Sequence, residues 1–381
     1  MAQPKINRRT FLTAAGAGMV CTANGRPQEA PLTSSSMKVL LWCWDSRMTW
    51  DDEPERIQTN MAASEIRFPY VKSSEAYLTG FRRLVDYCSK NDIWGIVIWG
   101  FLRDAHGGVT AARDLCLYAR DRGVSIVPGV GLCAYGGYYY DGEHPFNLEV
   151  YLKKHPERVS IAQEEGGKRS VAGVLDPSLP ENRQWWRDGL DWMLENFAIA
   201  GINYEMGDFI VNSSSSACAA RAALNIDTDE NIQDIVIATH DLMQYAHDVK
   251  PDGVFINALY RGYPQIKNVA NIPYVKALHP STVWQYTLTG MARETSFPEG
   301  LDVLPPHRQY GYLHWFNAST HTENRDYTAD IARACRGAYN LGFEFIGTYG
   351  ELKANSLLAD RNYRAQVFWS KNPLLAYDKF I

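Results

Sequence analysis

The chain has 381 residues, of which 46% are hydrophobic and 21% charged, and a formal net charge of −5. These proportions are typical of a globular protein with a sizeable core, and one α/β barrel of about 250 residues with loop insertions accounts for the length. The mild negative charge argues against nucleic acid or an anionic membrane surface as a partner. The 11 Trp, 22 Tyr and 14 Phe predict either a heavy core or an aromatic cleft.

Residues 1–36 predict a twin-arginine export signal followed by a linker. Arg8 and Arg9 precede a short Ala- and Gly-rich apolar stretch, the pattern of a leader that is removed on export. The stretch is shorter than the ~20 apolar residues of a membrane-spanning helix, so we expect a mature protein without membrane insertion, periplasmic or extracellular. Cleavage near Ala23 leaves 35 basic and 43 acidic residues, a net charge of −8. Lipidation at Cys21 is the alternative.

From residue 37 onward, short apolar runs alternate with amphipathic segments, the pattern of strand–helix units around a parallel sheet. Strands are expected at residues 38–44, 93–100, 124–130, 201–206, 253–259, 282–287, 309–316 and 343–349. Helices are expected at 74–90, 110–119, 181–197, 230–249 and 327–341, and a long irregular insertion follows the third strand. No Gly-x-Gly-x-x-Gly turn follows the first strand, which favours a closed barrel over an open sheet. Residues 37–381 therefore predict a single (β/α)8 TIM barrel, which we expect to be the catalytic domain.

The seven cysteines form no Cys-x-x-Cys pair. Five of them lie inside apolar segments and are expected to be buried thiols: Cys43, Cys88, Cys116, Cys133 and Cys335. The sequence therefore predicts neither a structural zinc site nor a disulfide framework, and we expect no metal and no cofactor.

The active site of a (β/α)8 barrel lies at the carboxyl ends of its strands, so polar and aromatic residues at or just after the predicted strand ends are the candidates. The expected substrate-binding residues are Asp45, Arg103, His106, Tyr138, Tyr139, Asn257, Arg261, Gln285, His314 and Trp315. Acids, amides and aromatic rings with little basic charge suit a neutral carbohydrate, which offers hydroxyl groups and apolar ring faces.

The expected catalytic residues are Glu205, Asp208 and Glu351. Cleavage of a glycosidic bond needs one protonated carboxylic acid at the leaving oxygen and a second, anionic group. Glu205 ends an apolar run, where loss of solvation favours the protonated form, so we assign it the acid role. Asp208 or Glu351 is then the anion. Purely structural roles stay open: Asp208 as a loop cap, Glu351 as the acid at a helix N-terminus.

Other candidates also have structural alternatives. His106 lies in a Gly-rich loop and is either a ligand or an ordinary loop residue. His314 alternates with apolar neighbours on a predicted strand and is either a site residue or a hydrogen-bonded core residue. The tyrosines at 138–140 form either a stacking surface or a lid that packs on itself.

Four stretches resemble the (α/β)8 glycoside hydrolases related to family 20 hexosaminidases and their bacterial relatives. These are YGGYYYDGEHP (135–145), LDPSLPENRQWW (175–186), YEMGDF…CAAR (204–221) and YRAQVFWSKNPLLAYDKFI (363–381). The resemblance implies an acid pair at the end of the fourth strand, with a Glu as acid and an Asp that orients an acetamido group. Gly207 and Asp208 match its Gly-Asp, and Phe209 stands where the family has its Glu. The available acid is then Glu205, three residues before Asp208.

We therefore expect an exported glycoside hydrolase that cleaves an oligo- or polysaccharide by carboxylate acid/base catalysis. Two other classes stay open. One is a carbohydrate-binding barrel without catalysis, the case if the carboxylates do not face each other. The other is a metal-dependent sugar isomerase or lyase with ligands among Glu205, Asp208, His240 and His314, although no His-x-His or His-Glu-x-x-His spacing supports it.

Overall fold

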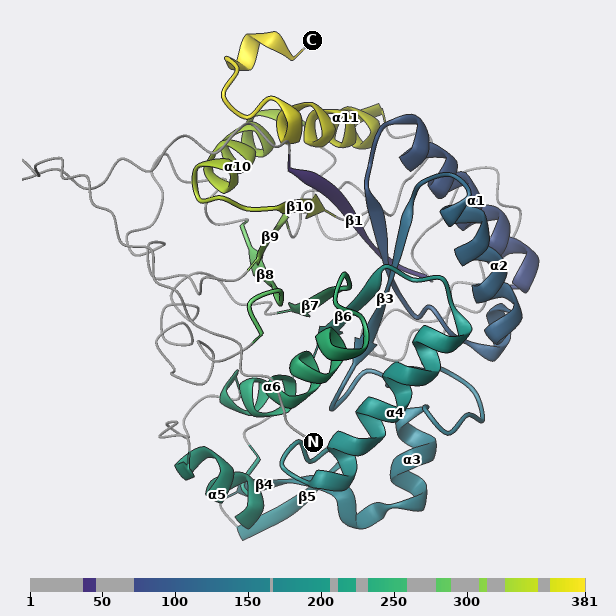
Figure 1. The fold of residues 1–381 in the computed structure, drawn as a ribbon, viewed down its shortest axis with the longest axis vertical. Coiled ribbons are helices and arrows are strands. Elements are labelled where there is room, and N and C mark those ends of the chain that lie inside the picture. Colours follow the sequence, from purple (N-terminus) through teal and green to yellow (C-terminus); the bar gives the residue numbers. More distant parts are fainter. Residues whose placement is uncertain are drawn as a thin grey trace, which may run out of the picture. The chain divides into compact units, whose positions relative to one another are not determined.

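The computed structural model describes residues 37–45, 72–164, 167–205, 212–223, 232–258, 279–288, 308–313, 326–348 and 357–380. In this part of the chain eight parallel strands close into a barrel, and helices lie around its outside (Figure 1). The predicted (β/α)8 barrel is confirmed.

The barrel strands all lie at predicted positions. They are β1 (Lys38–Trp44), β2 (Gly95–Trp99), β3 (Ser125–Gly131), β6 (Gly201–Glu205), β7 (Val254–Ala258), β8 (Val283–Thr287), β9 (Arg308–Leu313) and β10 (Phe345–Thr348). Each pairs in parallel with the next along the chain, β3 pairs with β6, and β10 closes the barrel against β1. All carboxyl ends therefore open at the same mouth.

The helices that follow the strands are α1 (Ser74–Lys90), α2 (Gly108–Arg120), α4 (Pro180–Asn196), α6 (Ile232–Val249), α10 (Thr328–Asn340) and α11 (Leu357–Lys371). Local sequence explains their starts. Ser73 caps α1 by accepting a hydrogen bond from the Ala76 amide at 3.2 Å. Pro180 occupies the first position of α4, where its missing N–H leaves no hydrogen bond unmade.

The insertion between β3 and α4 is more regular than predicted. It contains α3 (Leu148–Lys154), the 3-10 helix η2 (Pro156–Arg158), and strands β4 (Val159–Glu164) and β5 (Gly167–Leu175). β4 and β5 form an antiparallel hairpin that is separate from the barrel sheet. The described helices also include α5 (Ser215–Ala223), after β6, and two 3-10 helices, η1 (Asp104–His106) and η4 (Tyr377–Lys379).

Alternation along the strands separates two apolar layers. On β1, Leu41 and Cys43 pack in the layer shared with the helices, whereas Trp42 and Trp44 pack in a second cluster. This second cluster, called here the interior cluster, fills the barrel. It consists of Leu40, Trp42, Trp44, Val97, Trp99, Val127, Ala134, Tyr135, Tyr140, Val254, Ile256, Val283, Tyr310 and Phe345. The barrel is thus a packed core.

The five cysteines predicted to be buried are all buried. Over the same residues, no helix combines the length and apolar character needed to cross a bilayer.

Candidate active site

Glu205 stands at the carboxyl end of the barrel. It is the last residue of β6 and is half-buried. Ile202 and Tyr204 pack in the helix-facing layer, so strand alternation turns Asn203 and Glu205 toward the barrel interior. The amide of Leu132 donates a 2.7 Å hydrogen bond to the Glu205 carbonyl, which fastens the strand end to the loop after β3. The side chain predicted to be the general acid therefore belongs to the mouth.

Aromatic rings line one side of this end of the barrel, where β1, β2 and the loop after β3 meet. The Trp44 and Trp99 ring centroids lie 5.5 Å apart, Tyr140 meets Trp44 edge-on at 6.1 Å, and Tyr135 meets Trp99 edge-on at 6.3 Å. Burial raises the pKa of Tyr140; the Arg103 guanidinium acts to lower it, and the negative charges of Asp45 and Glu205 act to raise it. The Tyr140 hydroxyl thus interacts electrostatically with both carboxylates.

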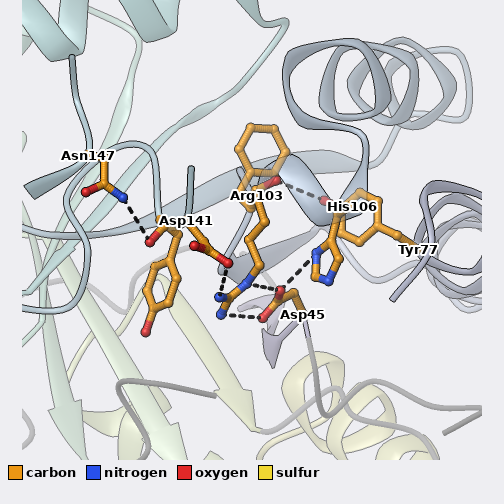
Figure 2. A network of polar contacts seen from close by, with 8 residues as sticks. Asp45, Tyr77, Arg103, His106, Asp141 and Asn147 are labelled. Carbon is orange, nitrogen blue, oxygen red and sulfur yellow. Dashed lines mark hydrogen bonds and ion pairs between the residues drawn. The ribbon is translucent and has the colours of Figure 1, made fainter. Parts of the chain in front are cut away.

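A buried ion network joins the ends of β1 and β2 (Figure 2). Arg103 Nε donates a 2.6 Å hydrogen bond to Asp45 Oδ2, and Nη2 donates a 3.5 Å one to Oδ1. His106 Nδ1 lies 3.0 Å from Asp45 Oδ2. Asp45 is fully buried, and Arg103 and His106 are 4% and 1% exposed. Burial acts to raise the pKa of Asp45, but Arg103 and His106 outweigh it and hold that pKa below its ordinary value.

Backbone geometry keeps this network in place. The Asp45 amide donates to the Trp99 carbonyl at 2.8 Å, where β1 and β2 end. Gly100 follows with φ of +74°, and a Cβ there would lie 2.2 Å from Asp45 Oδ1. Only glycine both adopts this conformation readily and leaves room for the carboxylate.

The network also supports the aromatic wall. The Arg103 guanidinium lies over the Tyr140 ring, 4.2 Å from its centroid, with Asp141 Oδ2 3.9 Å from its Nη1. On the other side, Tyr77 of α1 stacks against His106 with centroids 5.0 Å apart and ring planes 18° apart (Figure 2). The predicted residues Asp45, Arg103 and His106 are therefore together, and their described contacts connect α1 to the wall of the mouth.

Three expected substrate-binding residues are placed away from the interior, which corrects the prediction. Asn257 of β7 points outward, and its Nδ2 donates to Thr239 Oγ1 of α6 at 3.2 Å. Tyr138 is 3% exposed in the helix-facing layer, and its hydroxyl donates to the Trp186 carbonyl at 2.6 Å.

Tyr139 is the third of these residues. It is 4% exposed, its hydroxyl donates to Asp104, and its ring stacks on His144 with centroids 4.3 Å apart. Together with Tyr138 it packs the loop onto the barrel, so neither ring is a stacking surface in the mouth.

Gln285 of β8 does face the interior, where it accepts a 2.8 Å hydrogen bond at Oε1 from Asn203 Nδ2. The five remaining candidates lie outside the described residues: Asp208, Arg261, His314, Trp315 and Glu351. Among the residues that the structure describes, no group of three His, Cys, Asp or Glu side chains is arranged to hold a metal ion.

Some residues of the mouth were not selected from the sequence. Trp44, Trp99, Tyr140 and Asn203 all face the interior. The alternation of side chains between the two faces of a strand could have identified them. Trp42 and Trp44 share one face of β1, and Asn203 stands two positions before Glu205 on β6, so each pair points to the same side.

A surface cavity of about 450 Å³ lies elsewhere, lined by Asn91, Arg364, Val367, Phe368, Lys371, Asn372, Lys379 and Phe380. The Met37 amide donates to the Ser370 carbonyl at 3.0 Å, so this end of α11 lies beside the start of β1. The cavity is therefore at the amino end of the barrel, opposite Glu205, and Lys371 is already paired with Asp92 at 2.5 Å. The candidate active site lies at the other end.

No protein-family model matches the chain, and no curated protein matches its sequence. Solved structures share its fold. A debranching enzyme from Nostoc punctiforme has a TM-score of 0.53 at 11% identity, over 88% of this chain and 81% of its own. An α-amylase from Anoxybacillus has 0.52 at 10%, over 88% and 77%.

A GH20 exo-β-N-acetylglucosaminidase from Vibrio harveyi has a TM-score of 0.51 at 9% identity, over 91% of this chain but only 56% of its own length. At these identities the likeness shows the fold alone. The chain thus has a (β/α)8 barrel of the kind found in glycoside hydrolases of several families.

Proposed function

We propose that the protein is an exported glycoside hydrolase that cleaves an oligo- or polysaccharide with Glu205 as the general acid/base. The observation that carries the proposal is the placement of Glu205, at the carboxyl end of the barrel, on its interior face and beside an aromatic wall. The shared fold with glycoside hydrolases supports the substrate class.

The chemistry requires a proton at the leaving oxygen. Glu205 in its protonated form donates that proton as the bond between the anomeric carbon and the glycosidic oxygen breaks. A second carboxylate either attacks the anomeric carbon or removes a proton from the attacking water. We assign this second role to Asp208 or Glu351. Asp45 is unsuited to it because both of its oxygens are engaged by Arg103.

The remaining predicted residues have two roles in this proposal. Arg261, His314 and Trp315 contact the sugar, as their positions after strand ends suggest. Arg103, held by Asp45, fixes the Tyr140 ring near Glu205. This ring supplies part of the apolar wall against which a sugar face packs.

The resemblance to family 20 enzymes adds one member to the substrate panel. Gly207-Asp208 matches the part of that family's pattern that orients an acetamido group, so N-acetylated sugars are tested beside neutral hexoses. Export is the other part of the proposal: with Arg8 and Arg9 both changed to Lys, the protein should stay in the cytoplasm of a host with a twin-arginine pathway.

The experiment is the release of reducing ends or aryl alcohols from a panel of polysaccharides and aryl glycosides, with and without chelator. The proposal predicts turnover that chelator does not change and that Glu205→Gln reduces. The control is Glu195→Gln, which alters an exposed acid of α4. Sugar binding without turnover would indicate a carbohydrate-binding barrel, and turnover abolished by chelator would indicate a metal-dependent enzyme.

A further inference from the structure

Two buried amides lie side by side inside the barrel, next to Glu205. Asn203 and Gln285 are 0% and 1% exposed and share the 2.8 Å hydrogen bond from Nδ2 to Oε1. They reach each other across β7, where Ala258 pairs with Gln285. The small alanine side chain leaves room for the two amides to meet. Around them the interior cluster is apolar and aromatic.

Half of each amide has no partner among the described residues. The Asn203 Oδ1 acceptor and the Gln285 Nε2 donor are buried and make no hydrogen bond. A buried polar group left in this state has lost its hydration without gaining a hydrogen bond in exchange, which is unfavourable. The pair thus presents one acceptor and one donor side by side, the complement of a single hydroxyl group, which donates one hydrogen bond and accepts another.

Strand register places this pair at the reacting end of the barrel. Tyr204 pairs with Asn257, so Glu205 is level with Ala258, which in turn pairs with Gln285. Glu205 and Gln285 therefore stand at the same height on either side of β7, with backbones about 10 Å apart. Asn203 lies one interior position below Glu205. A sugar ring bound at Glu205 would have its substituents within reach of the amides.

We propose that Asn203 and Gln285 bind one hydroxyl group of the sugar residue whose glycosidic bond Glu205 protonates, and so select the sugar. This inference rests on the proposed function and names its substrate more closely: a neutral sugar with a hydroxyl group at the position that reaches the pair. A deoxy sugar leaves both amide groups unpaired. A uronic acid brings its carboxylate against Asn203 Oδ1 and the Glu205 side chain.

The test combines a series of monodeoxy and uronic analogues of the best aryl glycoside with variants of the pair. In the wild type, one deoxy analogue should lose at least about 10²-fold in kcat/KM, because a site built to bind a hydroxyl strongly rejects an analogue that lacks it. In Gln285→Met the parent glycoside should lose activity, and the difference between the parent and that analogue should fall to less than about fivefold.

Two further variants complete this test, one as a second change to the pair and one as a control. Asn203→Ser shortens the other amide side chain and should abolish the same discrimination if Gln285→Met does not fold. Asn257→Leu is the matched control, since Asn257 is a buried amide on β7 that faces α6 instead of the interior. It should retain the wild-type discrimination among the analogues.

Calorimetric binding of the free parent and deoxy sugars to wild type and Glu205→Gln separates the two proposals. Discrimination that depends on the pair in binding, without any turnover, overturns the glycosidase but supports the sugar-selecting pair. If Gln285→Met reduces the turnover of the parent and of every analogue by the same factor, the proposal that the pair selects the sugar is overturned. The two amides then have only a structural role, such as binding a water molecule. Absence of any sugar binding overturns both.

Discussion

Replacing Arg103 by Met removes the cation that lies 2.6 Å from the buried Asp45. Neither side chain is more than 4% exposed, so the variant leaves a carboxylate buried without its arginine. Loss of one partner of a buried pair typically costs 3–5 kcal/mol, since the remaining charge has lost its solvation and its partner together. We therefore expect Arg103→Met to lower the free energy of unfolding by about 3–5 kcal/mol at pH 8.

The pH dependence of this effect follows from the pKa of Asp45. In the wild type that pKa is lowered, so the contribution of the pair is complete above the ordinary value of 3.8 and is lost only as the pH falls through the lowered value. In the variant, burial, the largest single influence on this pKa, is opposed by His106 without the arginine, so we expect the pKa of Asp45 to rise above its unfolded value. The folded variant then takes up protons that the unfolded chain does not, and gains stability as the pH falls.

The assay is urea unfolding at pH 8 and pH 5, followed by tryptophan fluorescence, for wild type and variant. The loss in the free energy of unfolding should be smaller at pH 5 than at pH 8. The matched control is Arg122→Met, which breaks an ion pair with Asp86 of the same 2.6 Å length between side chains that are 37% and 54% exposed. That change should cost less than about 1 kcal/mol at both pH values. Equal costs for the two variants, or a loss for Arg103→Met that does not depend on pH, would refute the reasoning.

Two further predictions concern the same barrel. Gly100→Ala should lower the free energy of unfolding by more than about 2 kcal/mol, because the new Cβ collides with Asp45. The control is Gly123→Ala, at a similar φ of +69° with open space around it, which should cost only the backbone strain of about 1 kcal/mol. Equal losses of the two variants in thermal unfolding would exclude the collision. Burial lowers the pKa of His247 to about 4, helped by His279 and Arg308 and opposed by Asp248. As the pH falls, His247 is therefore protonated in the unfolded chain before it is protonated in the folded one, and the free energy of unfolding should fall by about 2 kcal/mol between pH 7.5 and 5. His247→Leu should remove this part of the pH dependence of stability. An unchanged pH dependence in the variant would contradict the prediction.

The fold could be predicted because barrel strands and their helices differ in the spacing of apolar residues. Helix α1 shows this most clearly: Tyr77, Phe81, Leu84 and Cys88 recur at helical spacing and are all buried. The β4–β5 hairpin was missed for the opposite reason. Its strands pair only with each other, outside the closed sheet, so their sequences lack the long apolar run of a barrel strand.

The site could be predicted only in part, because position along a strand does not determine on which side of it a residue lies. The strand-end rule selected Asp45, Arg103 and His106, which the structure places in one buried network; their expected role in substrate binding stays a prediction. It failed for Asn257, because a strand that is buried on both faces shows no alternation of apolar and polar residues in its sequence. The loop tyrosines 138 and 139 follow no periodic pattern, so their packing against α4 and Asp104 depends on tertiary contacts alone.

The central claim is that Glu205 delivers the proton to the leaving oxygen. The most direct measurement compares kcat/KM of wild type and Glu205→Gln over aryl glycosides of one sugar whose phenols span a range of pKa. We predict that the variant loses a factor on the order of 10² or more with the most basic phenols and much less with the most acidic, which leave without protonation. A loss that is uniform across the series, or no loss, would contradict the account.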